Sequence, residues 1–206
     1  MSDAAGGAGA SAARYLPDAP PSDPWELVAA WLPADDDPVR PTMTVATLDG
    51  GVPDARTLLL SGWSRDGFEF HTDSRSRKTA QLAADPAVAL MLHLGADAHQ
   101  LVVQGRAEPA GADADRRAFL RRSPYLQQLA WQNTAEFATL PLEDRRAAWA
   151  EFARDHADGF GEPPTWVGYR VVPHRIAFWQ GDPATASRRV EYRRSGDGWT
   201  VSIHAG

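Results

Sequence analysis

The sequence predicts an α+β protein in which an antiparallel β-barrel carries helices inserted between its strands. Short runs rich in apolar and β-branched residues follow one another through the middle and the end of the chain, as is typical of strands. Asp-Gly pairs at 49–50, 66–67 and 197–198 each stand beside or between such runs, and this pair is a strong signal of a hairpin turn. Helical patterns separate groups of strands, which favours a meandering antiparallel barrel.

The expected elements follow these patterns in chain order. A short amphipathic helix at 24–32 begins after Asp23, with Pro24 in its first turn, which is a common helix start. The other helices are expected at 77–85, 112–122, around 125–132 and at 142–157. The strands are expected at 42–48, 52–63, 68–72, 87–94, 99–111, 166–172, 175–181, 190–195 and 198–204.

The domain organisation is simple. Residues 1–24 are rich in Ala, Gly, Ser and Pro and are expected to form a flexible N-terminal arm. Residues 25–206 are expected to form a single domain, because a chain of 206 residues with 43% apolar residues is long enough to bury one core.

The composition excludes several classes of function. The chain has no cysteine, which excludes disulfides, thiolate catalysis and cysteine metal sites. Its net charge of −6 argues against a nucleic-acid partner, and no apolar run approaches a membrane span. The six histidines have no metal-ligand spacing, and the G-x-S-x-G motif is absent. We therefore expect a cytoplasmic protein with no secretory signal, no metal, and no membrane or nucleic-acid partner.

The only lysine of the chain, Lys78, follows Arg77 at the expected start of a helix. Ser74 or Ser76 is suited to cap that helix. Two cations in a first turn oppose the helix dipole, so the arrangement makes sense if an anion such as a phosphate binds there. An ordinary solvated helix start explains this stretch equally well when it is considered alone.

Arg56 is a second basic residue in an unusual position. It lies inside an expected strand, just before a nearly continuous apolar run. A buried charge there needs a partner, whereas an arginine on an edge strand that faces water needs none.

The run "PPTWVGYRVVPHRIAFWQG", residues 163–181, resembles the signature of the pyridoxine/pyridoxamine 5'-phosphate oxidase family. The runs "DARTLLLSGW", "GFEFHTDSRSRK" and "HQLVVQGRAE" are similar to that family's pattern in the same order, from about residue 41 onwards. The resemblance implies a Greek-key split barrel and a homodimer, with residues 163–206 as the C-terminal dimerisation region. It also implies FMN bound at the dimer interface.

The resemblance also implies which residues bind FMN. They are Arg56, Thr57, Leu58, Leu59, His71, Thr72, Arg77, Lys78, Gln100, Trp179 and Arg189. Arg77 and Lys78 are implied to hold the FMN phosphate, and Trp179 and Arg189 to reach the flavin across the dimer interface. His71 departs from the family, which has Tyr or Phe at this position.

One pair of the family's flavin-site residues is missing. The family has Gln-Ser where this chain has Ala135 and Glu136. Gln132 or Asn133 is the nearest candidate to replace that pair.

The positions that would bind the substrate depart further from the family. Lysine, tyrosine and serine are replaced by Ser61, Ala118 and Leu126, and only Arg122 is retained. The family's Arg-Leu-His triplet falls on residues 185–187, so its catalytic arginine and its histidine are both absent. A charge-assisted hydrogen bond is worth about 1.5–3 kcal/mol, so the loss of several predicts weak binding of pyridoxamine 5'-phosphate.

The resulting hypothesis is an FMN-dependent oxidase-like oxidoreductase that acts on a different, carboxylated or reduced aromatic substrate, with oxygen as the electron acceptor. Phenazine-pathway oxidases belong to the same superfamily, which fits a reduced aromatic substrate. Arg122 is expected to orient an anionic group. His71 and Ser187 are the candidates for polar or proton-transfer roles in catalysis.

Three alternatives stay open. The first is a genuine vitamin B6 oxidase in which Arg121 or Arg188 replaces the missing substrate contacts. The second is a non-catalytic flavin-binding protein. The third is a deazaflavin-using split-barrel protein, against which the Arg77-Lys78 pair and the sequence "FWQG" argue.

Overall fold

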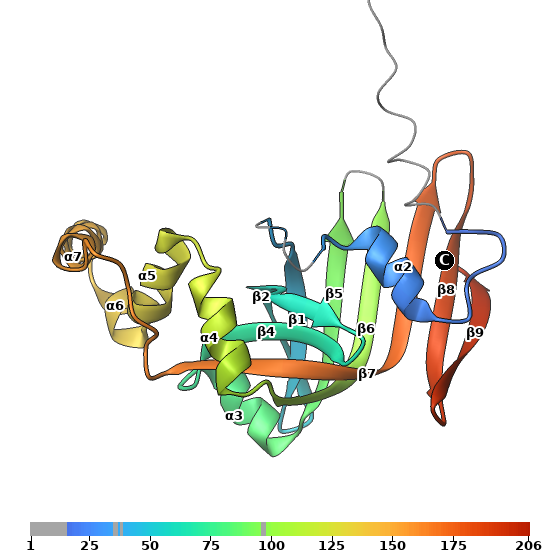
Figure 1. The fold of residues 1–206 in the computed structure, drawn as a ribbon, viewed down its shortest axis with the longest axis horizontal. Helices are drawn as coiled ribbons and strands as arrows, with labels where there is room; N and C mark the ends of the chain where they lie inside the picture. The colour runs from blue at the N-terminus through green and yellow to red at the C-terminus, as the bar shows by residue number, and fades with distance from the viewer. Residues whose placement is uncertain (1–15, 35–36, 38, 96–97) are drawn as a thin grey trace, which may run out of the picture.

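A computed structural model describes residues 16–34, 37, 39–95 and 98–206. The strands are β1 (Thr42–Asp49), β2 (Val52–Leu59), β3 (Gly62–Ser64), β4 (Gly67–Asp73), β5 (Ala87–Leu94), β6 (His99–Pro109), β7 (Trp166–Asp182), β8 (Thr185–Ser195) and β9 (Gly198–Ala205). They form one antiparallel sheet, in the order β2-β1-β5-β6-β7-β4-β3, with β8 between β7 and β9 (Figure 1). The expected α+β fold built on an antiparallel split barrel is confirmed.

Helices are inserted where the sequence predicts them, with one addition. They are α2 (Pro24–Trp31), α3 (Arg77–Ala84), α4 (Ala112–Leu120), α5 (Pro124–Gln132), α6 (Ala135–Thr139) and α7 (Leu142–Asp155). The short helix α6 was not expected. At the start of α2, the Trp25 backbone N–H donates to the Asp23 carboxylate (3.1 Å), so the predicted helix start is confirmed.

The expected break between strands 166–172 and 175–181 is wrong, because β7 runs through Pro173 without interruption. The pairing of β6 with β7 shifts its register just before Gly105, which lies opposite Pro173. Such a bulge accommodates a proline inside a sheet. Gly105 is needed there, since a Cβ atom would collide with the backbone carbonyl of Val172.

The length of β7 lets it connect the two parts of the sheet. Its first half pairs with β4, its second half pairs with β8, and β6 lies along its other side. Strand β7 therefore ties the barrel to the C-terminal hairpin of β8 and β9.

The single strand expected at 52–63 is also wrong. Strand β2 ends at Leu59 and β3 begins at Gly62. Between them, Leu60 and Ser61 are buried, and the Ser61 backbone N–H donates to the carbonyl of Glu69 on β4 (2.7 Å). This corner turns Ser61 inward at a point that matters for the candidate site.

The core lies inside the barrel and beneath α2. Along β5 and β6, buried and partly exposed residues alternate, as expected of strands with one face on a core. Helix α2 covers the sheet with two tryptophans: Trp25 stacks on Phe68 (5.4 Å between ring centroids) and Trp31 meets Phe178 edge-on (5.1 Å).

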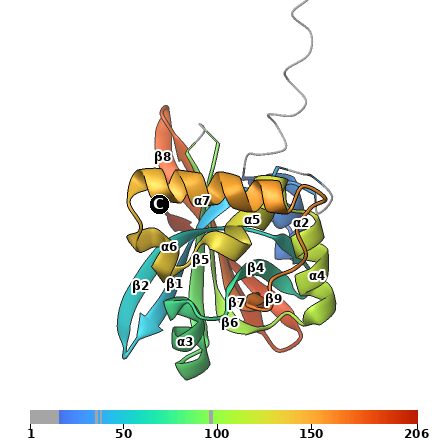
Figure 2. The ribbon, with the colours of Figure 1, turned by 90° about the vertical axis from the view of Figure 1, so that its left-hand side faces the viewer.

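Helices α5, α6 and α7 form a helical group at the end of the molecule opposite β8 and β9 (Figures 1 and 2). Aromatic contacts hold the group together, such as Tyr125 against Trp149 and Trp131 against Phe152. Gln128 also donates to the Trp149 carbonyl (2.7 Å). Helix α7 buries no residue.

The expected arm, 1–24, lies partly outside the described residues. Its described part begins at Leu16 and lies against β7 and β8. The Leu16 backbone N–H donates to the side chain of Gln180 (2.8 Å), and the Tyr192 hydroxyl donates to the carbonyl of Pro21 (2.9 Å). Residues 16–24 are therefore attached to the sheet.

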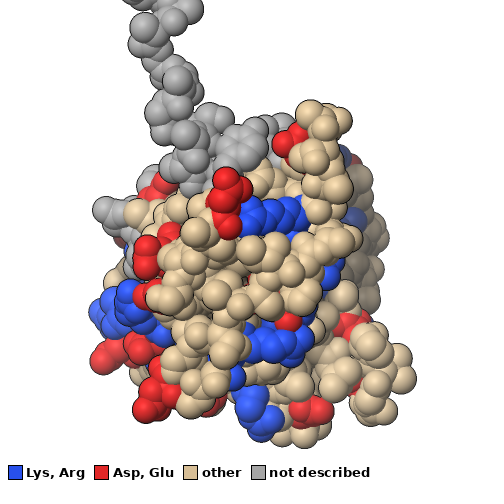
Figure 3. Space-filling model, turned by 90° about the vertical axis from the view of Figure 1, so that its right-hand side faces the viewer, with Lys and Arg blue, Asp and Glu red and all other residues tan. Residues whose placement is uncertain are grey.

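The end of the molecule formed by β8 and β9 presents a largely uncharged surface, with acidic and basic groups mostly around it (Figure 3). Strand β9 exposes Val201 and Ile203 there, at 41% and 51% of their full accessible area. Among the described residues, no helix is long and apolar enough to cross a membrane.

Candidate functional site

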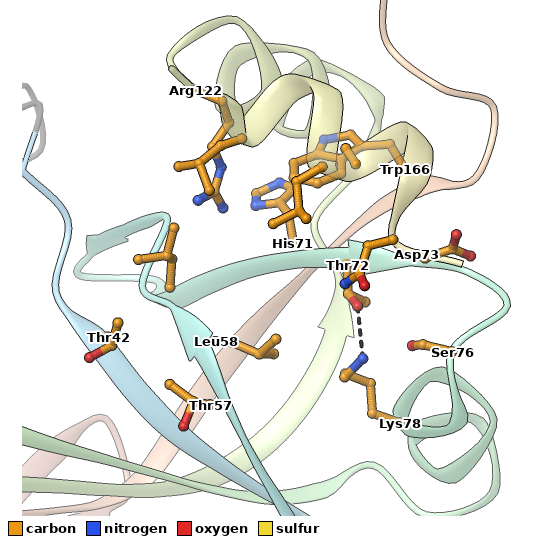
Figure 4. A pocket seen from close by; sticks show the side chains of 15 residues that line it. Thr42, Thr57, Leu58, His71, Thr72, Asp73, Ser76, Lys78, Arg122 and Trp166 are labelled. Carbon is orange, nitrogen blue, oxygen red and sulfur yellow. Dashed lines mark hydrogen bonds between the residues drawn. The ribbon is translucent and has the colours of Figure 1, made fainter. Parts of the chain in front are cut away.

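A cavity of about 340 Å³ opens between the barrel and the helical group. Its walls come from the ends of β1, β2 and β4, the start of α3, one face of α5 and the first residue of β7. The lining residues are Thr42, Thr57, Leu58, Leu59, His71, Thr72, Asp73, Ser76, Lys78, Arg122, Leu126, Leu129, Ala130, Asn133 and Trp166. Lys78 lies at one end and Arg122 at the opposite end (Figure 4).

The lysine end gathers polar groups from β4 and α3. The Lys78 ammonium donates to the hydroxyl of Thr72 (3.0 Å). Burial lowers the pKa of Lys78, and the charge of Arg56 acts in the same direction. Ser76 stands at the N-cap of α3, but its hydroxyl makes no capping bond and meets the hydroxyl of Thr79 instead (3.0 Å).

Arg77 does not line the main cavity. Its side chain is exposed and forms an ion pair with Asp54 on β2 (2.9 Å). It borders a neighbouring hollow that also includes Ser76, Asn133 and Glu136. The structure therefore separates the two cations predicted to share a phosphate, with Lys78 directed inward and Arg77 at the rim.

Arg56 lies on β2, the edge strand, but its side chain is turned inward and is fully engaged. It donates to the hydroxyl of Thr47 (2.6 Å) and to Gln81 (2.9 Å), and it pairs with Asp54 (2.8 Å). The partner that a buried charge needs is thus present. The following residues, Thr57 to Leu59, line the cavity in its place.

Arg122 occupies the other end of the cavity. It donates to the hydroxyl of Ser61 (2.9 Å), and Arg40 and Arg121 both donate to the carbonyl of the same serine. Among the described residues, no carboxylate pairs with Arg122. Burial lowers its pKa to about 10, with Arg40 and Arg121 adding to the shift, so it stays charged at neutral pH.

His71 lies beside Arg122, and its side chain is fully buried. Its ring stacks on Trp166 (5.3 Å between centroids, 13° between planes), and its Nε2 lies 3.3 Å from a carboxylate oxygen of Asp115. Burial lowers the pKa of His71 to about 3, and Arg122 and Arg121 act in the same direction. The imidazole is therefore neutral at physiological pH, and its role in proton transfer stays a prediction.

A second group of predicted residues lies outside the cavity, on neighbouring strands. Gln100 on β6 pairs with Trp179 on β7, and Trp179 pairs with Arg189 on β8. The sheet register thus brings these three together. Ser187 also lies on β8, away from the cavity walls.

The helical group supplies residues that the sequence reading left undecided. Asn133 lines the cavity, whereas Gln132 donates to the Ala148 carbonyl within the helical group (3.3 Å). Of the two candidates to replace the missing pair, Asn133 is therefore the better placed. Ala135 and Glu136 border the neighbouring hollow.

Sequence reasoning missed Trp166 and Asp115. The sequence predicts Trp166 only as part of the run at 163–181 and Asp115 only as part of the helix at 112–122. Helix periodicity offered one usable signal: Leu126, Leu129 and Ala130 share one face of α5, and that face lines the cavity.

Comparison with protein families decides the assignment. A family model described as Pyridoxamine 5'-phosphate oxidase matches residues 38–156. The chain belongs to the pyridoxine/pyridoxamine 5'-phosphate oxidase family. A second model, the family's C-terminal dimerisation region, matches residues 166–204. The family is one of oxidase-like flavoproteins, so the resemblance found in the sequence is confirmed.

Several curated relatives carry the name pyridoxine/pyridoxamine 5'-phosphate oxidase. The one from Ralstonia pickettii is 37% identical over 162 residues, which is 77% of this chain and 76% of that protein. The one from Caulobacter vibrioides is 36% identical over 188 residues, which is 87% of this chain and 83% of that protein.

Two solved structures extend the comparison. PhzG from Burkholderia lata, in complex with tetrahydrophenazine-1-carboxylic acid, has a TM-score of 0.76 and 25% identity, covering 92% of this chain and 95% of that one. A pyridoxamine 5'-phosphate oxidase-related, FMN-binding protein from Nostoc punctiforme has a TM-score of 0.60 and 18% identity, covering 80% and 86%. The second supports the fold alone.

Proposed function

We propose that the protein is an FMN-dependent oxidase that acts on an anionic aromatic substrate, carboxylated or partly reduced, and not primarily on pyridoxamine 5'-phosphate. The observation that carries the proposal is the partly buried, charged Arg122 in the cavity wall, bonded to a serine and, within the described residues, to no carboxylate. A cation in this state is suited to receive an anionic group from a ligand.

The lysine end of the cavity fits the phosphate of FMN. Lys78, Thr72 and Ser76 offer an ammonium and two hydroxyl groups at the start of α3, where backbone N–H groups favour an anion. Arg77 lies next to them at the rim, within reach of a phosphate from the solvent side. The strand residues Thr57 to Leu59 would then lie along the flavin.

The rest of the cavity fits a flat, apolar ring. Leu126, Leu129 and Ala130 form its apolar wall. In the proposed reaction, FMN would supply the redox chemistry, as the acceptor of a hydride from the substrate, with oxygen as the final electron acceptor. The protein's own contribution is to orient the substrate: Arg122 would hold its anionic group while the α5 residues exclude water from its ring.

The second group of predicted residues supports a homodimer with the flavin at its interface. Gln100, Trp179 and Arg189 lie together on β6, β7 and β8 but do not line the cavity of their own chain. We propose that they complete the cavity of the opposite subunit. The matched dimerisation region and the apolar residues Val201 and Ile203 that β9 exposes are consistent with this arrangement.

The second candidate function is the vitamin B6 oxidase activity named for the relatives at 35–38% identity. One structural observation favours it: Arg40 and Arg121 both lie at Ser61, where the family's lysine stands. If these arginines bind a phosphate, they replace the missing lysine.

Two measurements test the proposal. The absorbance spectrum and mass of the ligand released from purified protein should identify FMN, and a colourless protein that takes up no FMN would contradict the cofactor assignment. Steady-state assays then compare pyridoxine and pyridoxamine 5'-phosphates with dihydroaromatic carboxylic acids. We expect flavin reduction by the acids. Efficient turnover of the vitamin phosphates alone would instead support the second candidate, and no turnover of either would favour a flavin-binding protein without activity.

A further inference from the structure

The guanidinium of Arg122 is held by only two groups that the structure describes. One is the hydroxyl of Ser61 (2.9 Å). The other is the indole ring of Trp166, whose centroid lies 5.6 Å from the guanidinium carbon, within the range of a cation–π contact. A single hydrogen bond to a serine leaves an arginine free to rotate. The indole is the larger surface, so it is the better candidate to fix the guanidinium.

Trp166 is itself held firmly in place. Its indole N–H donates to the backbone carbonyl of Asp115 (3.0 Å), and the edge of its ring meets Phe119 (5.7 Å, 74°). His71 stacks on it almost in parallel. Trp166 also lines the cavity, which distinguishes it from the core tryptophans of α2.

The charge state of His71 matters for this arrangement. A protonated imidazole stacked on the indole would place a second cation on the ring that Arg122 uses. Because burial and the neighbouring arginines keep His71 neutral, His71 does not place a second cation beside Arg122 on the indole ring. A carboxylate oxygen of Asp115 lies 3.3 Å from Nε2, but the two atoms form no hydrogen bond; the imidazole is held by its stacking on the indole.

The same contact explains a glycine in the facing strand. Gly168 pairs with His71 across β4 and β7. A Cβ atom at this position would collide with both His71 and Asp115, so only glycine leaves space for the two side chains to meet.

We propose that Trp166 is a positioning residue that orients the guanidinium of Arg122 toward the anionic group of the substrate, and that His71 and Asp115 hold Trp166 in place. The inference rests on the proposed function, because it gives Arg122 the role of binding the substrate. It adds a specific dependence: Trp166 acts on the substrate only through Arg122.

A double-mutant cycle tests this dependence. The probe is 1-naphthoate, an aromatic carboxylate, titrated into FMN-loaded protein and followed by the change in flavin absorbance. We expect Arg122→Met to weaken binding about 10- to 100-fold and Trp166→Leu about three- to ten-fold. In the Arg122→Met background, Trp166→Leu should have less than about a two-fold effect. Equal effects of Trp166→Leu in both backgrounds would overturn the inference.

Controls keep the result interpretable. Trp149→Leu, in the helical group, removes a tryptophan that contacts Tyr125 and Phe137 but does not line the cavity, so it should leave binding unchanged. If Trp166→Leu does not fold, Trp166→Phe keeps a ring and loses the bond to Asp115, so it should show the same coupling at smaller size.

The failure of the proposed function would look different. If Arg122→Met binds 1-naphthoate as well as the wild type, Arg122 does not receive the anion, and both proposals fail. If the wild type binds no 1-naphthoate, the cycle is repeated with pyridoxal 5'-phosphate, whose phosphate is also an anion. Coupling there supports the role of Trp166 while rejecting the proposed substrate class, and additivity rejects both.

Discussion

The two ends of the cavity differ in how closely they follow the family to which the chain belongs. At the lysine end, Lys78 is directed inward and bonded to Thr72, whereas Arg77, the other cation expected at a phosphate, stands at the rim. At the arginine end, Ser61 stands where the resemblance implies a lysine, and Arg122 contacts this serine and Trp166. This difference motivates the proposal that the lysine end binds the cofactor phosphate and the arginine end binds an anionic substrate.

Arg77 and Arg122 differ in the groups that surround each guanidinium. Arg77 is tied to a carboxylate, Asp54, and stands at the rim. Arg122 is partly buried and, among the described residues, has no such partner. A buried cation without an anion carries a desolvation cost that a bound substrate anion would offset. An anionic ligand should therefore bind more favourably at the arginine end than at a solvated surface.

The largest expected effect is at the lysine end. Replacing both Arg77 and Lys78 by alanine should weaken FMN binding about 100- to 1000-fold, since each charge-assisted hydrogen bond contributes about 1.5–3 kcal/mol. Most of the loss should come from Lys78→Ala, because Arg77 is exposed and already paired with Asp54. Titration of the apoprotein with FMN, followed by fluorescence quenching, measures the effect.

The matched control for this experiment is Arg75→Ala. Arg75 lies in the same turn but is exposed and paired with Asp73 (2.7 Å), so FMN affinity should not change. If the double variant binds FMN as tightly as the wild type, the phosphate binds elsewhere, and the contrast between the two ends disappears.

The next effect is at the arginine end. Arg122→Met should lower kcat/KM for an anionic substrate about 10- to 100-fold and leave FMN affinity unchanged. Since the pKa of Arg122 is lowered to about 10, wild-type affinity should fall as the pH rises through that value, while the variant should show no such fall. Arg116→Met, an exposed change on α4, is the control. A loss of FMN affinity in Arg122→Met would mean that the two ends are not separate.

A smaller effect is expected behind the arginine end. Gly168→Ala should destabilise the protein by about 1–3 kcal/mol, the usual cost of overpacking, because the new methyl group would push His71 and Asp115 apart. Gly161→Ala is the control, since its Cβ would meet nothing within 4 Å. Urea unfolding at fixed protein concentration and saturating FMN compares the two. Equal midpoints would show that the His71–Asp115 contact is not tightly packed.

Most helices and strands could be predicted from the sequence, because the patterns that mark them arise from interactions between neighbouring residues. The alternation along β5 and β6 and the cap of α2 follow from neighbouring residues alone. The continuous strand β7 could not be predicted, since Pro173 is accommodated by a bulge in its pairing with β6. The division of 52–63 into two strands likewise depends on a contact of Ser61 with Glu69 on another strand.

The candidate site was predicted where a family pattern covers it and missed where it depends on distant contacts. The pattern singled out Lys78 and Arg122, and both line the cavity. Nothing in the local sequence indicates that Asp115 on α4 meets His71 on β4, because they come together only through the packing of α4 against the start of β7. The ion pair between Arg77 and Asp54 could not be predicted for the same reason.

The smallest expected effect concerns the pH dependence of stability at the arginine end. The pKa of His71 is about 3 in the folded protein and about 6.5 when unfolded, so the unfolded state binds a proton first as the pH falls below 6.5. Stability should therefore decrease on acidification, at up to about 1.4 kcal/mol per pH unit for this group. The pKa of Asp115 is raised by burial, which acts in the opposite sense and reduces the net change. His71→Phe keeps a ring on Trp166 but cannot titrate, so its urea midpoint should fall less between pH 7 and about pH 4.5. The exposed His93→Phe should behave as the wild type does. If the urea midpoint of His71→Phe instead falls with pH as the wild-type midpoint does, the imidazole is not buried in its neutral form. A neutral His71 could then no longer explain why Arg122 is the cation that contacts the Trp166 indole.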